Sequence, residues 1–98
     1  MKITEQVISE VQRATEKFPT WPTDPLHALA VLGEEYGELN KAVLQSVYEP
    51  HKSTPEEVRE EAIQTAAMAL RFLMSLGQYE YIRAEQHTQV RSLDEISA

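Results

Sequence analysis

Apolar residues recur three and four positions apart over most of the chain, which is the period of an amphipathic helix. In the first segment this spacing predicts a helix over about residues 4–17. The residues that carry the spacing are Val7, Ile8, Val11 and Ala14. The helix is expected to end near Phe18, because Pro19 and two further prolines before residue 26 forbid regular structure there.

Two longer helices are indicated by capping residues that stand directly before a proline. Thr23 or Asp24 is expected to cap a helix that has Pro25 in its first turn and runs to about Val47. The segment Thr54-Pro55-Glu56-Glu57 combines a cap, a first-turn proline and the glutamate of a capping box. It predicts a third helix that runs to Leu76 and stops at Gly77.

The remainder of the chain completes a single helical domain. We expect a short fourth helix over about residues 78–87 and a polar tail over residues 88–98. Strand patterns are absent, since the sparse β-branched residues never alternate with polar ones. The fold class predicted is therefore all-α, an antiparallel helical bundle in one domain over residues 1–87.

Size and composition bear on how such a bundle is stabilised. The chain has 98 residues, of which 42% are hydrophobic and none is cysteine. So short a chain buries only about 60–65% of its unfolded surface, which leaves a marginal core. Apolar surface that one copy cannot bury usually finds a partner, so self-association is expected. Without cysteine there is no disulfide, no thiolate metal site and no cysteine nucleophile.

The formal net charge of −7 disfavours binding to a nucleic-acid polymer, because phosphate backbones are held by clustered Lys and Arg. An acidic protein can still bind a nucleotide if divalent cations bridge carboxylates to phosphates, although acidity also simply keeps proteins soluble. Residues 1–5 lack the apolar core of a signal peptide. Nor does any stretch approach the roughly 18 apolar residues of a membrane span, so a cytoplasmic protein with no membrane partner is expected.

Two glutamates interrupt an otherwise small and apolar stripe on the second helix. Ala28, Val31, Glu35, Glu38 and Ala42 are spaced 3, 4, 3, 4 and should face a neighbouring helix. Glu34 lies about 100° away around the helix and is better placed for solvent. On the third helix, which is apolar nearly all round and should be buried, Glu61 and Gln64 share one side with Met68 and Arg71.

Buried carboxylates require protonation, a basic partner or a cation, because an isolated buried charge costs several kcal/mol or more. Lys41 and Arg71 are the only basic residues expected at the right level, too few for three carboxylates. Hard oxygen ligands suit Mg²⁺ or Mn²⁺, so we interpret the set as a metal site. The alternative is that the glutamates lie at the rim of the bundle with their carboxylates in water.

These residues resemble those of the all-α nucleoside triphosphate pyrophosphohydrolase superfamily, the MazG-like proteins, whose pattern is E-E-x-x-E on one helix and E-x-x-D on the next. Residues 34–38, Glu-Glu-Tyr-Gly-Glu, match the first half, and residues 61–64 match the second except that Gln64 replaces aspartate. The resemblance covers about residues 21–76 and also includes the flanking Pro25-Leu-His-Ala-Leu-Ala-Val-Leu and Leu39-Asn-Lys-Ala.

The resemblance implies cleavage of a nucleoside triphosphate or related nucleotide to a monophosphate and pyrophosphate, with Mg²⁺ or Mn²⁺ as cofactor. It also implies a homodimer or homotetramer whose bundles are completed between subunits. The implied metal ligands are Glu35, Glu38, Glu61 and Gln64. Glu34 and Glu38 are implied as catalytic residues, with Glu34 a further ligand or a water-orienting base, and Lys41 and Arg71 would contact phosphate oxygens.

Other positions leave alternatives open. Trp21 either stacks on a nucleotide base or plugs the end of the bundle. His27, two turns before Glu35, either contacts substrate or is a surface residue. Because glutamine brings no charge and cannot act as a base, Gln64 leaves two functions open: a working enzyme, or a non-catalytic helical oligomer that binds nucleotide or metal as an interaction module.

Overall fold

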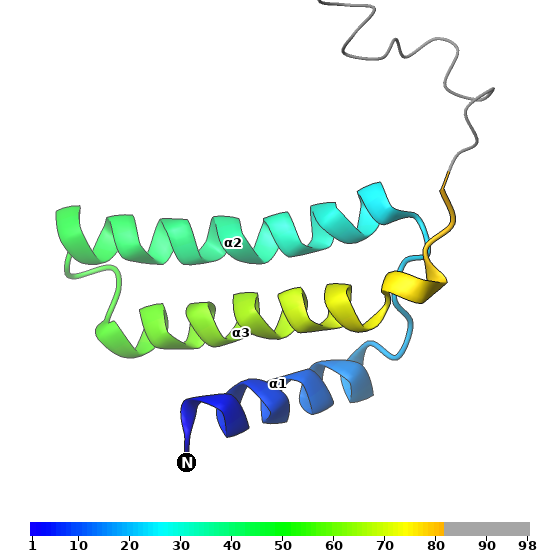
Figure 1. Cartoon of the computed structure of the whole chain (residues 1–98). Coiled ribbons are helices and arrows are strands. Elements are labelled where there is room, and N and C mark those ends of the chain that lie inside the picture. Colours follow the sequence, from blue (N-terminus) through cyan, green and yellow to red (C-terminus); the bar gives the residue numbers. More distant parts are fainter. Residues whose placement is uncertain (82–98) are drawn as a thin grey trace, which may run out of the picture.

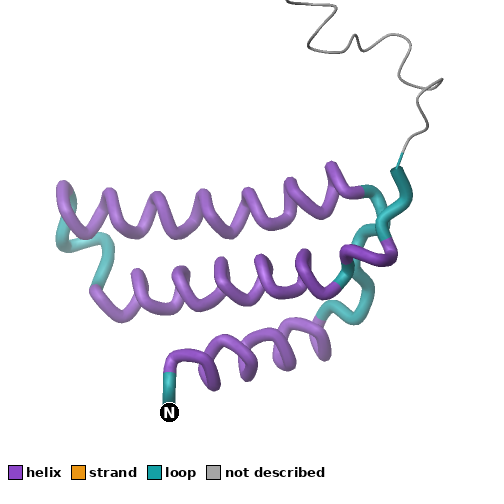
Figure 2. Tube along the Cα trace, viewed as in Figure 1, coloured by secondary structure: helices purple, strands orange, loops and turns teal. Residues whose placement is uncertain are grey.

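The computed structural model describes residues 1–81 as three α-helices and one short 3₁₀ turn (Figure 1). Helix α1 spans Ile3–Lys17, α2 spans Pro25–Tyr48, α3 spans Pro55–Met74, and the 3₁₀ turn η1 spans Leu76–Gln78. Within residues 1–81 there is no β-strand (Figure 2), which confirms the predicted all-α class.

Local capping explains where α2 and α3 begin. The Asp24 carboxylate accepts a hydrogen bond from the Leu26 amide at 2.9 Å, and Pro25 takes the first helical position. The Thr54 hydroxyl accepts from the Glu57 amide at 3.2 Å, and Pro55 follows it in the same way. Both arrangements satisfy an N–H group that has no partner inside the helix. The predicted starts of these helices are therefore confirmed.

The C-terminal end of α3 differs from the prediction. The helix ends at Met74 rather than Leu76, because the Ser75 amide donates to the carbonyls of Arg71 and Phe72 and the chain tightens into η1. The fourth helix predicted over residues 78–87 is wrong for residues 79–81, which are not helical. There the backbone is extended, and the Glu80 amide donates to the Thr23 carbonyl at 2.9 Å. Residues 82–87 and the predicted tail over 88–98 lie outside the described residues.

The three helices form a layer with α3 in the middle (Figure 1). Helix α3 packs against both α1 and α2, whereas no Cα atom of α1 comes within 8 Å of a Cα atom of α2. The buried centre consists of Ala14 of α1 with Ala67 and Met68 of α3. Small residues at these contacts let the helix backbones approach closely. Half-buried apolar side chains of α1, α2 and the loop between them surround this centre: Val7, Val11, Trp21, Val31 and Leu32.

Much apolar surface remains exposed in the single chain. The expectation that α3 is buried nearly all round is met only along the side that faces its neighbours. Leu73 and Met74 are 59% and 70% exposed, and Ala62 and Ala69 are also exposed. Among residues 1–81, no helix combines the length and the apolar character that crossing a lipid bilayer requires.

Candidate functional site: a groove between two separated helices

The separation of α1 from α2 leaves a groove between them, with a cavity volume of about 980 Å³. Helix α3 forms its floor through Gln64, Met68 and Arg71, and residues 18–24 close one end. The α2 wall presents His27, Val31, Glu34 and Glu35, and the α1 wall presents Glu10, Arg13, Ala14 and Lys17. The groove is therefore lined by carboxylates on one wall and by both charges on the other.

The predicted stripe on α2 does face α3. Ala28 and Ala42 are buried, Glu35 is half-buried, and Glu34 and Glu38 are exposed. Beside this stripe the Thr65 hydroxyl lies 2.8 Å from the Glu61 carbonyl of its own helix and 3.1 Å from the Glu35 carbonyl of α2. The turn of α2 that bears Glu35 therefore packs directly against the turn of α3 that bears Glu61.

The carboxylates of Glu35 and Glu61 repel their acidic neighbours. Partial burial raises the pKa of Glu35, and the charges of Glu61, Glu38, Glu34 and Glu10 raise it further. Partial burial likewise raises the pKa of Glu61, with Glu38 the strongest charged neighbour. The Glu61 Oε2 atom is buried and has no hydrogen-bond partner among residues 1–81. A buried acceptor without a partner is costly.

No base among residues 1–81 compensates these charges. The ion pairs formed there join Arg13 to Glu10 and Lys52 to Glu49, neither of which involves Glu35, Glu38 or Glu61. Over the same residues, no three His, Asp or Glu side chains come close enough together to hold a metal ion by themselves. Mg²⁺, however, is commonly held by one or two carboxylates, with water and substrate phosphate filling its other positions. Two carboxylates with an unpartnered oxygen fit that requirement.

The structure brings some of the other predicted site residues to the groove and leaves one elsewhere. Gln64 lies on the floor, and His27 is exposed on the α2 wall. Lys41 instead lines a separate shallow depression with Asn40 and Tyr48, so it does not share the groove with Gln64.

Trp21 and Arg71 meet at the closed end of the groove in a cluster of satisfied polar groups. The Trp21 indole N–H donates to the Tyr79 hydroxyl at 2.9 Å, and that hydroxyl donates to the Phe72 carbonyl at 3.0 Å. The Arg71 guanidinium stacks 4.9 Å from the centre of the Trp21 ring and donates to the Phe18 carbonyl at 2.8 Å. Burial lowers the pKa of Arg71. Trp21 thus closes the end of the bundle and also lines the groove.

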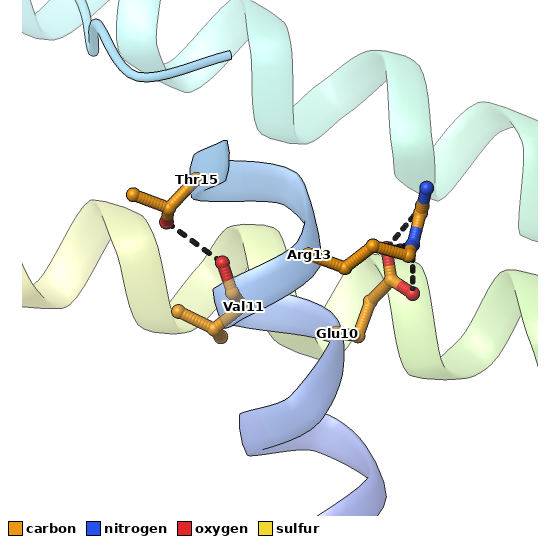
Figure 3. A network of polar contacts seen from close by, with 4 residues as sticks. All are labelled: Glu10, Val11, Arg13 and Thr15. Carbon is orange, nitrogen blue, oxygen red and sulfur yellow. Dashed lines mark hydrogen bonds and ion pairs between the residues drawn. The ribbon is translucent and has the colours of Figure 1, made fainter. Parts of the chain in front are cut away.

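Residues of α1 were not predicted as part of the site. Arg13 and Lys17 lie four positions apart, so they share one face of α1, and both line the groove. Figure 3 shows the Arg13 guanidinium against the Glu10 carboxylate, with Nε of Arg13 at 2.9 and 3.1 Å from its two oxygens. The spacing of Glu10, Arg13 and Lys17 is visible in the sequence, but it does not indicate which helix these side chains face.

Comparison of this chain with protein-family models, with curated proteins and with solved structures finds no significant match. The function of the chain is therefore inferred from the groove and the side chains that line it.

Proposed function

We propose that this chain is a divalent-metal-dependent nucleoside triphosphate pyrophosphohydrolase of the MazG-like type, which converts a nucleoside triphosphate to a monophosphate and pyrophosphate. The observation that carries the proposal is the pair of partly buried carboxylates on adjacent helices, Glu35 and Glu61, with one oxygen unpartnered. Glu35 lines a groove large enough for a nucleotide, since ligand sites typically enclose about 300–1,000 Å³, and Glu61 lies one helical turn before Gln64 on its floor.

In this proposal Glu35 and Glu61 hold Mg²⁺ or Mn²⁺, with Glu38 close enough to influence both carboxylates. The metal supplies Lewis-acid stabilisation of phosphate oxygens and lowers the pKa of a bound water. Gln64, one turn after Glu61, offers a neutral carbonyl oxygen as a further ligand. The exposed carboxylates of Glu34 and Glu38 accept the proton of the attacking water and orient it.

Self-association is part of the same proposal. Helix α2 carries exposed apolar side chains at heptad-like spacing, and together they form a seam on the side of α2 away from the carboxylates. The members of this seam are Leu26, Leu29, Tyr36, Val43 and Val47. Covering it with a second copy gives the short chain the buried area that its own core lacks. A homodimer or homotetramer by sedimentation supports this, and a monomer at all concentrations contradicts it.

The activity is tested by pyrophosphate release from a panel of nucleoside triphosphates with Mg²⁺ or Mn²⁺. Glu38→Gln keeps the shape of the side chain and removes its charge, so it should abolish release. Glu16→Gln on the exposed face of α1 is the matched control and should behave as the unaltered protein. Release that survives Glu38→Gln, or its absence with every nucleotide in the unaltered protein, would contradict the proposal.

A second function is favoured by one observation, the neutral Gln64 in a chain whose described residues contain no group of three metal-binding acids. The chain would then be a helical oligomer that binds nucleotide or metal as an interaction module without turnover. Calorimetry separates the two functions. Binding of a nucleotide with Mg²⁺, together with no pyrophosphate release from that nucleotide, would identify the module.

A further inference from the structure

The groove brings basic side chains together with acidic ones in a chain whose formal net charge is −7. Three of the residues that line it are basic, Arg13, Lys17 and Arg71, and four are acidic, Glu10, Asp24, Glu34 and Glu35. The basic groups lie on the α1 wall and the floor, whereas the α2 wall carries Glu34 and Glu35.

The three cations differ in how freely they can bind a ligand. Arg71 is 7% exposed and is held by the Phe18 carbonyl and the Trp21 ring. The Arg13 side chain is 57% exposed, although Glu10 holds its guanidinium. Lys17 lies with its Nζ atom 5.5 Å from the centre of the exposed Phe18 ring and forms no ion pair with any of residues 1–81. The two groups available to an anion are therefore those of α1.

We propose, on the basis of the function proposed above, that Arg13 and Lys17 form the phosphate-binding wall of the groove. The polyphosphate of the nucleotide lies between this wall and the carboxylates of α2. An arginine binds phosphate oxygens with two parallel N–H donors, and a lysine adds a compact charge one turn away. This assignment replaces Lys41, which lies in a different depression, as the cation that contacts phosphate.

Substitution of Glu10 should change phosphate affinity in the opposite direction from substitution of Arg13 or Lys17. In the ligand-free arrangement its carboxylate occupies the donors of Arg13 that a phosphate would use (Figure 3). A bound polyphosphate takes over these donors and releases Glu10. Removing the carboxylate in Glu10→Gln therefore frees Arg13 and removes a negative charge from the wall, so phosphate should bind more tightly.

The experiment measures binding of inorganic tripolyphosphate to the full chain by calorimetry, with and without Mg²⁺. Arg13→Gln and Lys17→Gln should each weaken binding about 10- to 100-fold, as expected for a lost hydrogen bond to a charged group. Glu10→Gln should strengthen it severalfold. Lys2→Gln, a cation that precedes α1 and does not line the groove, is the control and should leave binding unchanged. Added salt should weaken binding to the unaltered protein.

The outcomes separate this inference from the proposed function. Unchanged tripolyphosphate binding in Arg13→Gln and Lys17→Gln, or weaker binding in Glu10→Gln, overturns the inference. A loss confined to Lys41→Gln overturns it as well. If tripolyphosphate binding follows the expected order but no nucleotide releases pyrophosphate, the phosphate-binding wall is supported and the enzymatic function is contradicted. If turnover occurs with an unchanged KM in Arg13→Gln and Lys17→Gln, the enzymatic function is supported and the phosphate-binding wall is contradicted.

Discussion

Two regions along α3 contain partly buried charged groups, and they treat these groups in opposite ways. At the C-terminal end, Arg71 has a carbonyl acceptor and an aromatic face, and Trp21 and Tyr79 form a continuous hydrogen-bonded chain. In the middle, one buried oxygen of Glu61 has no partner among residues 1–81, and the charges that raise the pKa of Glu35 all come from further acids. Among residues 1–81, the polar groups at the C-terminal end of α3 therefore have hydrogen-bond partners, whereas the carboxylates in its middle have no basic partner.

The difference separates structural polar groups from groups suited to a ligand. Polar clusters whose hydrogen bonds are all made fix the geometry of a fold, because leaving any buried member without its partner costs free energy. Uncompensated like charges destabilise a fold unless something else binds them. Substitutions at the end cluster should therefore destabilise the protein, whereas removal of charge in the middle should stabilise it while weakening metal binding.

The largest effect is expected from Arg71→Ala. It removes the stack on Trp21, leaves the Phe18 carbonyl without its donor, and opens a cavity at the end of the groove. The free energy of unfolding should fall by about 2–3 kcal/mol, measured by urea denaturation. Lys41→Ala, at an exposed position on α2, should change it by less than about 0.5 kcal/mol. Equal effects of the two substitutions would show that the end cluster contributes no more to the free energy of unfolding than an exposed side chain does.

Gln64→Asp should give the next effect by supplying a charge beside Glu61. Mg²⁺ binding measured by calorimetry should tighten by about 1 kcal/mol or more, because a charged ligand replaces a neutral one. Gln64→Asn has a shorter side chain of the same polarity and should not tighten binding. An unchanged Mg²⁺ affinity in Gln64→Asp would place residue 64 away from the metal.

Tyr79→Phe should destabilise the end cluster by a smaller amount. The Trp21 indole loses its acceptor and the Phe72 carbonyl loses its donor, which together cost about 1 kcal/mol. Because Trp21 is the only tryptophan, its fluorescence reports on the same contact, and its emission maximum should shift. A Tyr81→Phe variant, at a 68% exposed position, serves as the control. Identical emission in all three proteins would mean that Tyr79 does not hold the indole.

The smallest effect concerns pH. Since the folded-state pKa values of Glu35 and Glu61 are raised above 4.5, the folded protein binds more protons than the unfolded one above pH 4.5. These two groups therefore lower the stability as pH rises through their raised pKa values, and contribute no slope below about 4.5. Glu61→Gln should flatten this decline and raise stability near pH 7 by about 0.5–1 kcal/mol.

Urea denaturation between pH 4 and 7 measures how the free energy of unfolding changes with pH, and Glu16→Gln is the control. Added Mg²⁺ should reverse the difference in stability between Glu61→Gln and the unaltered protein. Mg²⁺ binds the folded protein only, so it should stabilise the unaltered protein more than Glu61→Gln. A steeper decline in Glu61→Gln than in the unaltered protein would contradict the assignment of repulsion to this residue.

The sequence predicts the helices of this fold better than their arrangement. The caps at Asp24 and Thr54 act within four residues, so they are readable locally, and the structure confirms them. The stripe containing Glu35 is likewise a property of one helix, and it does face α3. Which outer helix lies across the groove from α2 is not a local property, so the α1 residues Arg13 and Lys17 were missed.

Contacts between distant segments were also missed. The Trp21–Tyr79 hydrogen bond joins residues far apart in sequence, and no periodic pattern indicates it. Tyr79, which makes this contact, has an extended backbone where the fourth helix was predicted. Helical spacing placed Lys41 near the carboxylates along α2, but its position around the helix points it to another depression.

The backbone separation of α1 from α2 leaves the two walls of the groove supported through α3 rather than through each other. A change in the angle of α1 on α3 would therefore change the width of the groove without displacing the backbone of α2. Helix α1 packs only on α3 among the described helices, so it can open locally while the α2–α3 hairpin stays folded. If α1 opens in this way, the groove widens while the hydrogen bond from Thr65 to the Glu35 carbonyl keeps the turns bearing Glu35 and Glu61 together.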